Sequence, residues 1–124
     1  MIVGIGVDVV EVDRFHAIAA RTPGFAERVL TPEERHHRDG SPRSRASLAA
    51  RWAAKEAVAK ALGAPAGMAW HDCEVSVDDA GRPHLLLRGS VLEVADRLGI
   101  THWHVSLTHD GGVAIAYVLA ERLP

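Results

Sequence analysis

The stretch RWAAKEAVAKALG, from Arg51 to Gly63, carries the most informative pattern in the chain. It closes the longest helix that the sequence predicts, from about Arg43 to Leu62, because the segment is rich in alanine and ends at a glycine. With ~100° between successive residues, a stripe of small side chains lies within ~80° of Ala53. The stripe consists of Ala46, Ala49, Ala50, Ala57 and Ala61, and the bulkier Leu48, Val58 and Leu62 lie on the other side, near Arg51 and Lys55. This pattern predicts a helix that is apolar most of the way round and largely buried.

Two charged residues, Glu56 and Lys60, fall inside the alanine stripe. Their spacing of i,i+4 allows them to pair with each other on an ordinary helix, and the alanine side could be the more exposed one. A partly buried Glu and Lys cost free energy unless another group pairs with them. The alternative hypothesis is that Glu56 holds a cation and Lys60 holds an anion that a ligand brings.

The first strand supplies a possible partner for Glu56. Residues 2–10 alternate with the period of a strand, and Asp8 shares one face with Gly4 and Gly6. Without side chains at the two glycines, another backbone or a ligand can approach closely. A carboxylate from a strand and one from a helix would suit Mg²⁺, which prefers oxygen ligands and substrate phosphates. A strand-end Asp that accepts a local backbone hydrogen bond is the other interpretation.

The remaining pattern predicts an α+β fold with an antiparallel sheet, in the order β-α-α-α-β-β-α-β-β. A short helix is expected from Glu11 to about Arg21, and Thr31 before Pro32 is typical of a helix start. Later elements are strands at 73–77, 84–88, 103–109 and 113–120, and a helix capped by Ser90 that reaches about Leu98.

Composition narrows the possible functions. A chain of 124 residues fits a single domain over 1–124, and oligomerisation is common at this size. The net charge of -2 disfavours a broad nucleic-acid-binding surface. A single cysteine, Cys73, excludes an internal disulfide and is expected to be a core residue. Without a signal peptide or an apolar run of ~18 residues, no membrane association is expected, and the chain is predicted to be a cytoplasmic soluble protein.

The histidines and Ser106 suggest other chemistries that the sequence supports poorly. No Cys or His spacing matches a structural zinc motif. Ser106 lacks the strained elbow motif of a serine hydrolase. His109 is different because it ends a predicted strand directly before the turn at 110–112, where a ligand could reach it.

Several blocks of the sequence together resemble one family. They are GIGVDVV (4–10) with Arg14-Phe15, FAERVLTPEE (25–34), RWAAKEAVAKALG (51–63), Gly81-Arg82-Pro83, and HVSLTH (104–109) followed by AIA (114–116). Their joint order and spacing resemble those of bacterial holo-acyl-carrier-protein synthases. The resemblance covers nearly the whole chain and is weakest over residues 35–44.

The resemblance implies a 4'-phosphopantetheinyl transferase fold, a homotrimer, and transfer of phosphopantetheine from coenzyme A to a serine of apo-acyl carrier protein, in fatty-acid or polyketide synthesis. It implies that Asp8 and Glu56 bind Mg²⁺, and that Lys60 contacts the coenzyme A phosphates. Arg51, Pro83 and His109 are implied at the nucleotide end. The predicted helix directs Arg51 away from Glu56, so Arg51 could serve a ligand wrapped around the helix or a neighbouring subunit, or be solvated.

A mechanism follows in which the serine hydroxyl attacks the β-phosphate and expels 3',5'-ADP. Glu56 and Lys60 are the predicted catalytic residues; either Glu56 or a water ordered by the metal could accept the serine proton.

Carrier proteins of this kind are typically acidic, so a basic docking surface of Arg14, Arg21 and Arg28 is expected; ordinary solvated arginines are the alternative. A non-catalytic module that binds coenzyme A or a carrier, and another metal-dependent phosphate enzyme, are the competing functions.

Overall fold

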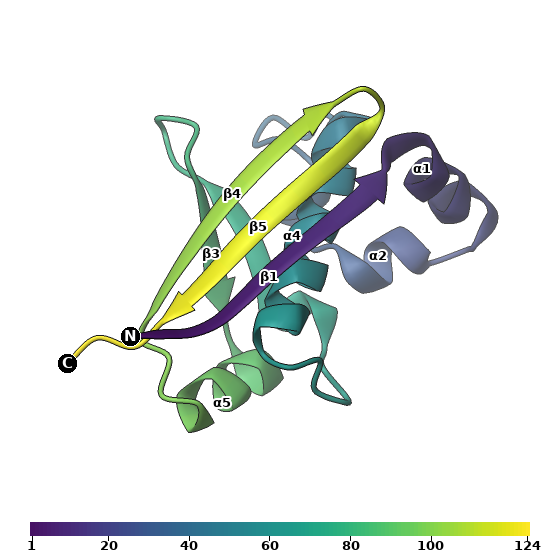
Figure 1. The fold of residues 1–124 in the computed structure, drawn as a ribbon. Helices are drawn as coiled ribbons and strands as arrows, with labels where there is room; N and C mark the ends of the chain where they lie inside the picture. Colours follow the sequence, from purple (N-terminus) through teal and green to yellow (C-terminus); the bar gives the residue numbers. More distant parts are fainter.

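The computed structural model describes all residues, 1–124, as an α+β fold (Figure 1). The strands are β1 (Ile2–Glu11), β2 (Cys73–Val77), β3 (Pro83–Leu87), β4 (His102–Asp110) and β5 (Val113–Glu121). The helices are α1 (Val12–Arg21), α2 (Phe25–Val29), α3 (Pro32–Arg35), α4 (Arg45–Ala61) and α5 (Gly89–Arg97), with a 3-10 turn, η1 (Trp70–Asp72). None of the helices has the length and apolar character that a membrane span requires.

The strands form two antiparallel sheets. The first has three strands in the order β1-β5-β4, and the second is the β2-β3 hairpin. In the first sheet Val7 stands opposite Tyr117, and Asp8 stands opposite Ala116, which also faces Leu107 of β4. The first and last strands of the chain are therefore neighbours, with β1 at the edge of the sheet and Asp8 toward the end of that strand.

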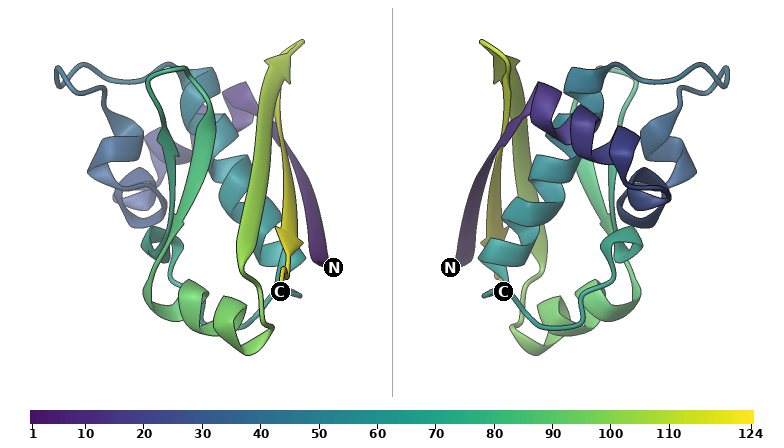
Figure 2. Two further views of the ribbon diagram at one scale, coloured as in Figure 1. Left: turned by 90° about the vertical axis from the view of Figure 1, so that its left-hand side faces the viewer. Right: turned by 90° about the vertical axis from the view of Figure 1, so that its right-hand side faces the viewer.

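Helix α4 lies between the three-stranded sheet and the β2-β3 hairpin (Figure 2). Its alanine side packs against β1 and β5, so this side is buried. A Cβ atom at Gly4 would collide with the carbonyl oxygen of Ala61, and one at Gly6 would collide with that of Ala57. The prediction that the glycine face of the first strand admits another backbone is confirmed, and the approaching backbone is that of α4.

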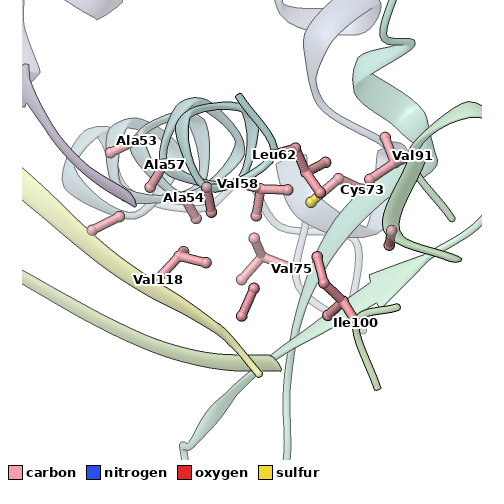
Figure 3. Packing of buried hydrophobic residues seen from close by; sticks show 14 residues of the cluster. Ala53, Ala54, Ala57, Val58, Leu62, Cys73, Val75, Val91, Ile100 and Val118 are labelled. Carbon is pink, nitrogen blue, oxygen red and sulfur yellow. The ribbon is translucent and has the colours of Figure 1, made fainter. Parts of the chain in front are cut away.

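The main core fills the space between α4, the first sheet and the hairpin (Figure 3). Val58 of α4 and Leu62, the C-cap of that helix, meet Cys73 and Val75 of β2 and Val118 of β5 there. Cys73 is a core residue, as expected, and burial raises the pKa of its thiol to about 12. A second buried cluster joins α1 and α2 to the first half of α4; it contains Phe15, Val29, Leu30, Ala49, Ala50 and Ala114.

The predicted long helix is confirmed, with Ser44 as its N-cap, and so is the Thr31 start of α3, where Thr31 and Glu34 form a capping box. Two short elements, α2 and η1, were not predicted. The prediction that Ser90 caps α5 is wrong: the helix begins at Gly89, and the Asp72 carboxylate accepts hydrogen bonds from the Ser90 backbone N–H (2.8 Å) and hydroxyl (2.7 Å). This cap comes from a distant residue, which local sequence rules do not reveal.

Candidate active site

The predicted cluster of Asp8, Glu56 and Lys60 comes together where β1 crosses α4. Asp8 alternates with the glycines on the face of β1 that meets the helix, and its side chain is 17% exposed. Lys60 Nζ donates to Asp8 Oδ1 at 3.0 Å and to the Val7 carbonyl oxygen at 3.0 Å. Because its side chain is 53% exposed, the ammonium group remains accessible to a ligand.

Glu56 lies beside this pair and forms no ion pair of its own; Lys60 pairs with Asp8 instead, so the hypothesis of a Glu56–Lys60 pair is wrong. Burial raises the pKa of the Glu56 carboxyl above its usual value, the nearby charge of Asp8 raises it further, and Lys60 lowers it in part. Two neighbouring carboxylates thus repel each other, and one ammonium group offsets only part of their charge.

The two carboxylates border a groove of about 570 Å³. Its lining combines this acidic end with a largely apolar wall from β1, α1, α4 and β5; it consists of Asp8, Val9, Val10, Glu11, Arg14, Phe15, Ile18, Trp52, Glu56 and Val113. Arg14 of the predicted docking surface therefore shares the groove with the predicted metal ligands. Arg21 and Arg28 are also exposed, at the end of α1 and in α2, outside the groove.

The donor set at the acidic end fits a small hard cation. Mg²⁺ takes oxygen ligands and is commonly held by one or two protein carboxylates together with substrate phosphates. Asp8 and Glu56 supply two carboxylates from different elements, and the mutual repulsion that raises the pKa of Glu56 would be relieved by a cation between them.

Arg51 lies apart from this cluster and is buried, with only 4% of its surface exposed. Its Nη1 donates to the Ser47 hydroxyl at 2.5 Å, while its buried Nε has no partner. Burial first, and the charge of Arg43 second, lower the pKa of Arg51 to about 10. The alternative that Arg51 is simply solvated is therefore wrong, and a buried guanidinium without a carboxylate partner suits an anionic ligand.

Pro83 and His109, the other predicted contacts of the nucleotide, lie in two other parts of the fold. Pro83 lines a second groove of about 800 Å³ between the β2-β3 hairpin and β4, together with Arg82, His102, His104 and Ser106. His109 is exposed near the end of β4, opposite Ala114 of β5. Within one chain, Asp8, Glu56 and Arg14 therefore line one groove, and Lys60 pairs with Asp8. Arg51, Pro83 and His109 are not part of the lining of that groove.

The sequence did not indicate two residues: Trp52 in the groove and Arg43 beside Arg51. Trp52, one turn before Glu56, lines the groove and contacts Phe15 and Phe25, with ring centroids 6.2 and 6.0 Å away. Arg43 lies close enough to Arg51 to lower its pKa, and it falls in the segment where the sequence pattern is least informative. The i,i+4 spacing of Trp52 and Glu56 could have indicated Trp52; no local signal indicates Arg43.

Comparison with known proteins assigns this arrangement to a family. The profile described as "4'-phosphopantetheinyl transferase superfamily" matches residues 4–118. A curated "Holo-[acyl-carrier-protein] synthase" from Salinispora arenicola is 59% identical over 98% of this chain and 100% of its own length. Among solved structures, the "Chronobacterium ammoniagenes ACPS-CoA complex" is 32% identical with a TM-score of 0.83, over 98% of each chain. A holo-(acyl-carrier-protein) synthase from Bacillus anthracis in complex with CoA (3',5'-ADP) is 35% identical with a TM-score of 0.78, over 99% of each chain. The chain therefore belongs to the 4'-phosphopantetheinyl transferase superfamily, as one of its holo-[acyl-carrier-protein] synthases.

Proposed function

We propose that this chain transfers the 4'-phosphopantetheine group of coenzyme A to a serine of apo-acyl carrier protein at the Asp8–Glu56–Lys60 cluster, and that the reaction depends on Mg²⁺. The observation that carries the assignment of the site is that Asp8 and Glu56 line one groove together with Arg14, while Lys60 pairs with Asp8 beside it. The family relationship supplies the reaction, since relatives of the same fold are holo-[acyl-carrier-protein] synthases described with CoA.

The metal belongs to the acidic end of the groove. Asp8 and Glu56 would hold Mg²⁺ with their carboxylate oxygens. When bound, the ion supplies positive charge that polarises phosphate oxygens and offsets the negative charge of the transition state. Lys60 would orient the Asp8 carboxylate, as its 3.0 Å contact supports.

Side chains of this protein would accept the serine proton and offset part of the negative charge that develops on the phosphate oxygens. The serine oxygen forms a bond to the β-phosphorus, the bond from that phosphorus to the bridging oxygen breaks, and 3',5'-ADP leaves with the electron pair. Glu56 is unpaired within the chain and has a raised pKa, which suits it to accept the serine proton. The half-exposed Lys60 ammonium would stabilise the phosphate oxygens on which charge develops.

Arg51 and Arg43 would bind an anionic group at the nucleotide end of coenzyme A. Phosphate recognition by paired guanidinium groups gives strong, directional hydrogen bonds. The buried, unpartnered Nε of Arg51 supports this role, because a phosphate would supply the missing acceptor. Pro83 and His109 remain predicted contacts of the same nucleotide.

A homotrimer would reconcile these scattered positions, because a site shared between subunits can take residues from two chains. The outer face of the first sheet supports an interface: Ile5, Val7, Val9 and Tyr117 are 52%, 47%, 59% and 45% exposed there. Exposed apolar faces of this kind commonly mark protein–protein interaction surfaces.

The carrier would dock on the basic residues of α1 and α2. Arg14, Arg21 and Arg28 are exposed, and Arg14 borders the groove that ends at Glu56. An acidic partner steered to this side would present its serine to the acidic end of the groove. The cytoplasmic location and the choice between fatty-acid and polyketide carriers stay predictions from the sequence.

The proposal is tested by following the release of 3',5'-ADP from coenzyme A by chromatography. Release is expected only when the chain, apo carrier and Mg²⁺ are all present, and not with a carrier whose acceptor serine is replaced by alanine. Release without any carrier would show hydrolysis of coenzyme A and contradict the transferase assignment.

A further inference from the structure

A fully buried ion pair lies on the side of α4 that faces away from the first sheet. Lys55 and Glu34 have no exposed side-chain surface, and Lys55 Nζ lies 2.7 Å from Glu34 Oε1. The same ammonium group donates to the backbone oxygens of Trp70 at 2.8 Å and Cys73 at 2.6 Å. An ammonium group has three protons, so each of the three contacts can take one of them.

Glu34 is equally well satisfied. Its Oε1 accepts a hydrogen bond from the Thr31 backbone N–H at 2.9 Å, which is half of the capping box of α3. Its Oε2 accepts from the Val75 backbone N–H at 2.8 Å. The pair therefore ties α4 at once to α3, to η1 and to the start of β2.

Burial of this pair is costly, because both charges lose their hydration. Apolar residues of similar volume commonly stabilise a core as well as a buried ion pair does. Apolar contacts tolerate small shifts of a helix. Hydrogen bonds to fixed backbone groups, in contrast, define both the rotation of the helix about its axis and its position along that axis. The pair therefore contributes orientation that hydrophobic packing alone does not supply.

That orientation bears directly on Glu56, the next residue of the helix. On the opposite side of α4, ~200° from Lys55, the carbonyl oxygen of Ala57 rests on Gly6 of β1. This glycine contact sets how closely the helix approaches the strand. The polar contacts of Lys55 oppose rotation of the helix about its axis. The glycine contact and the Lys55 contacts together therefore determine where the Glu56 carboxylate lies relative to Asp8.

We infer that Lys55, anchored by Glu34 and by the Trp70 and Cys73 carbonyls, is a positioning residue that holds Glu56 in register with Asp8. The inference rests on the proposed function, because it concerns the geometry of the proposed metal ligands. It assigns no contact between Lys55 and the substrates, which the buried position of Lys55 excludes.

The test compares K55M with V58A, a control that cuts a buried apolar side chain of the same helix without touching the polar network. Turnover, the KM values of coenzyme A and carrier, and half-saturating Mg²⁺ are measured per folded molecule. Binding of Mn²⁺, as a probe for Mg²⁺, is measured separately by paramagnetic resonance. For K55M we expect turnover to fall about 10- to 100-fold and metal affinity to fall about 10-fold, with the carrier KM unchanged. V58A is expected to lose stability only.

Equal turnover and equal Mn²⁺ affinity in K55M and V58A would overturn the positioning role. If K55M does not fold, the double variant E34Q/K55M leaves no unpaired charge and keeps a capping-box acceptor. The same loss of metal affinity is expected for it, and wild-type affinity would overturn the inference. Failure of both variants to fold would assign the pair to folding alone and also overturn it. An inactive wild-type chain would instead refute the proposed function, so the two failures are distinguishable.

Discussion

Lys60 Nζ lies 3.0 Å from Asp8 Oδ1, 52 positions away in the sequence, although Glu56 stands one helical turn before Lys60 on the same helix. This contact joins the first strand to the long helix and leaves the Glu56 carboxylate without a cationic partner of its own. An acidic pair that is only partly neutralised is a suitable place for a metal ion, and the first prediction follows from it.

Loss of either carboxylate should lower the rate of the reaction strongly. D8N and E56Q are each expected to lower turnover about 100-fold or more, because the charge that holds the cation is halved. The rate is measured as a function of Mg²⁺ concentration, and the variants should require more Mg²⁺ for half-maximal activity. D13N is the matched control, since Asp13 is exposed in the nearby first turn of α1. Near-normal rates in both D8N and E56Q would reject the metal assignment.

Arg51 is expected to lower the stability of the free chain and to strengthen the binding of coenzyme A. R51M removes a buried guanidinium that has no acidic partner, so the free chain is expected to gain about 1 kcal/mol of unfolding free energy. The KM for coenzyme A is expected to rise about 10-fold or more, because a charged hydrogen bond to phosphate is lost. Thermal unfolding and steady-state kinetics measure the two effects. R45M, an exposed arginine of the same helix, is the control and should change neither. An unchanged KM in R51M would contradict the nucleotide role.

Sequence periodicity was sufficient to predict the strands, the long helix and the α+β class, because each depends on a local repeat. It also brought Asp8, Glu56 and Lys60 together as candidates. It could not select the partner of Lys60, because the crossing of β1 over α4 depends on Gly4 and Gly6 meeting the carbonyls of the helix.

The burial of Arg51 was also beyond the helical pattern. A helical wheel gives the direction of a side chain but not what covers it. The short elements were missed for the same reason: α2 and η1 are held by aromatic contacts to α4, with Phe25 at 6.0 Å and Trp70 at 4.8 Å from the Trp52 ring. Their sequences contain too few residues for a helical period to emerge.

The docking surface should be sensitive to charge reversal. R14E is expected to raise the KM for the acidic carrier about 10-fold while the KM for coenzyme A changes little, because steering acts on the protein partner. Raising the salt concentration should narrow the difference between R14E and the wild type. R97E, on the exposed side of α5, is the control. Equal changes in both KM values for R14E would reject this docking surface.

The exposed face of the first sheet should determine the oligomeric state. Val7 and Tyr117 stand opposite each other on it, at 47% and 45% exposure. V7E would place a charge in a subunit interface, so we expect the trimer to dissociate into monomers, as measured by sedimentation or light scattering. L92E, at an exposed leucine of α5, should leave the assembly intact. A wild-type chain that is monomeric at all concentrations would refute the trimer.

The cap of α5 predicts an acid-dependent loss of stability. Hydrogen bonds from Ser90 hold the pKa of Asp72 below its ordinary value of 3.8. A lowered pKa in the folded state means that the stabilisation is complete above the unfolded pKa and is lost as the pH falls through the folded one. D72N should therefore cost about 1 kcal/mol at neutral pH. The difference from the wild type should shrink as the pH falls below 3.8 and through the lower pKa that Asp72 has in the folded state. Denaturant unfolding at several pH values measures this; a cost independent of pH would contradict the linkage.

The most direct test of the central claim is the intact mass of an apo-acyl carrier protein after incubation with this chain and coenzyme A, in Mg²⁺ or in EDTA. The account predicts that the carrier gains the mass of one phosphopantetheine group in Mg²⁺, that the gain is absent in EDTA, and that E56Q nearly abolishes it. An unmodified carrier in Mg²⁺ with the folded wild-type chain, or a full gain in EDTA, would contradict it.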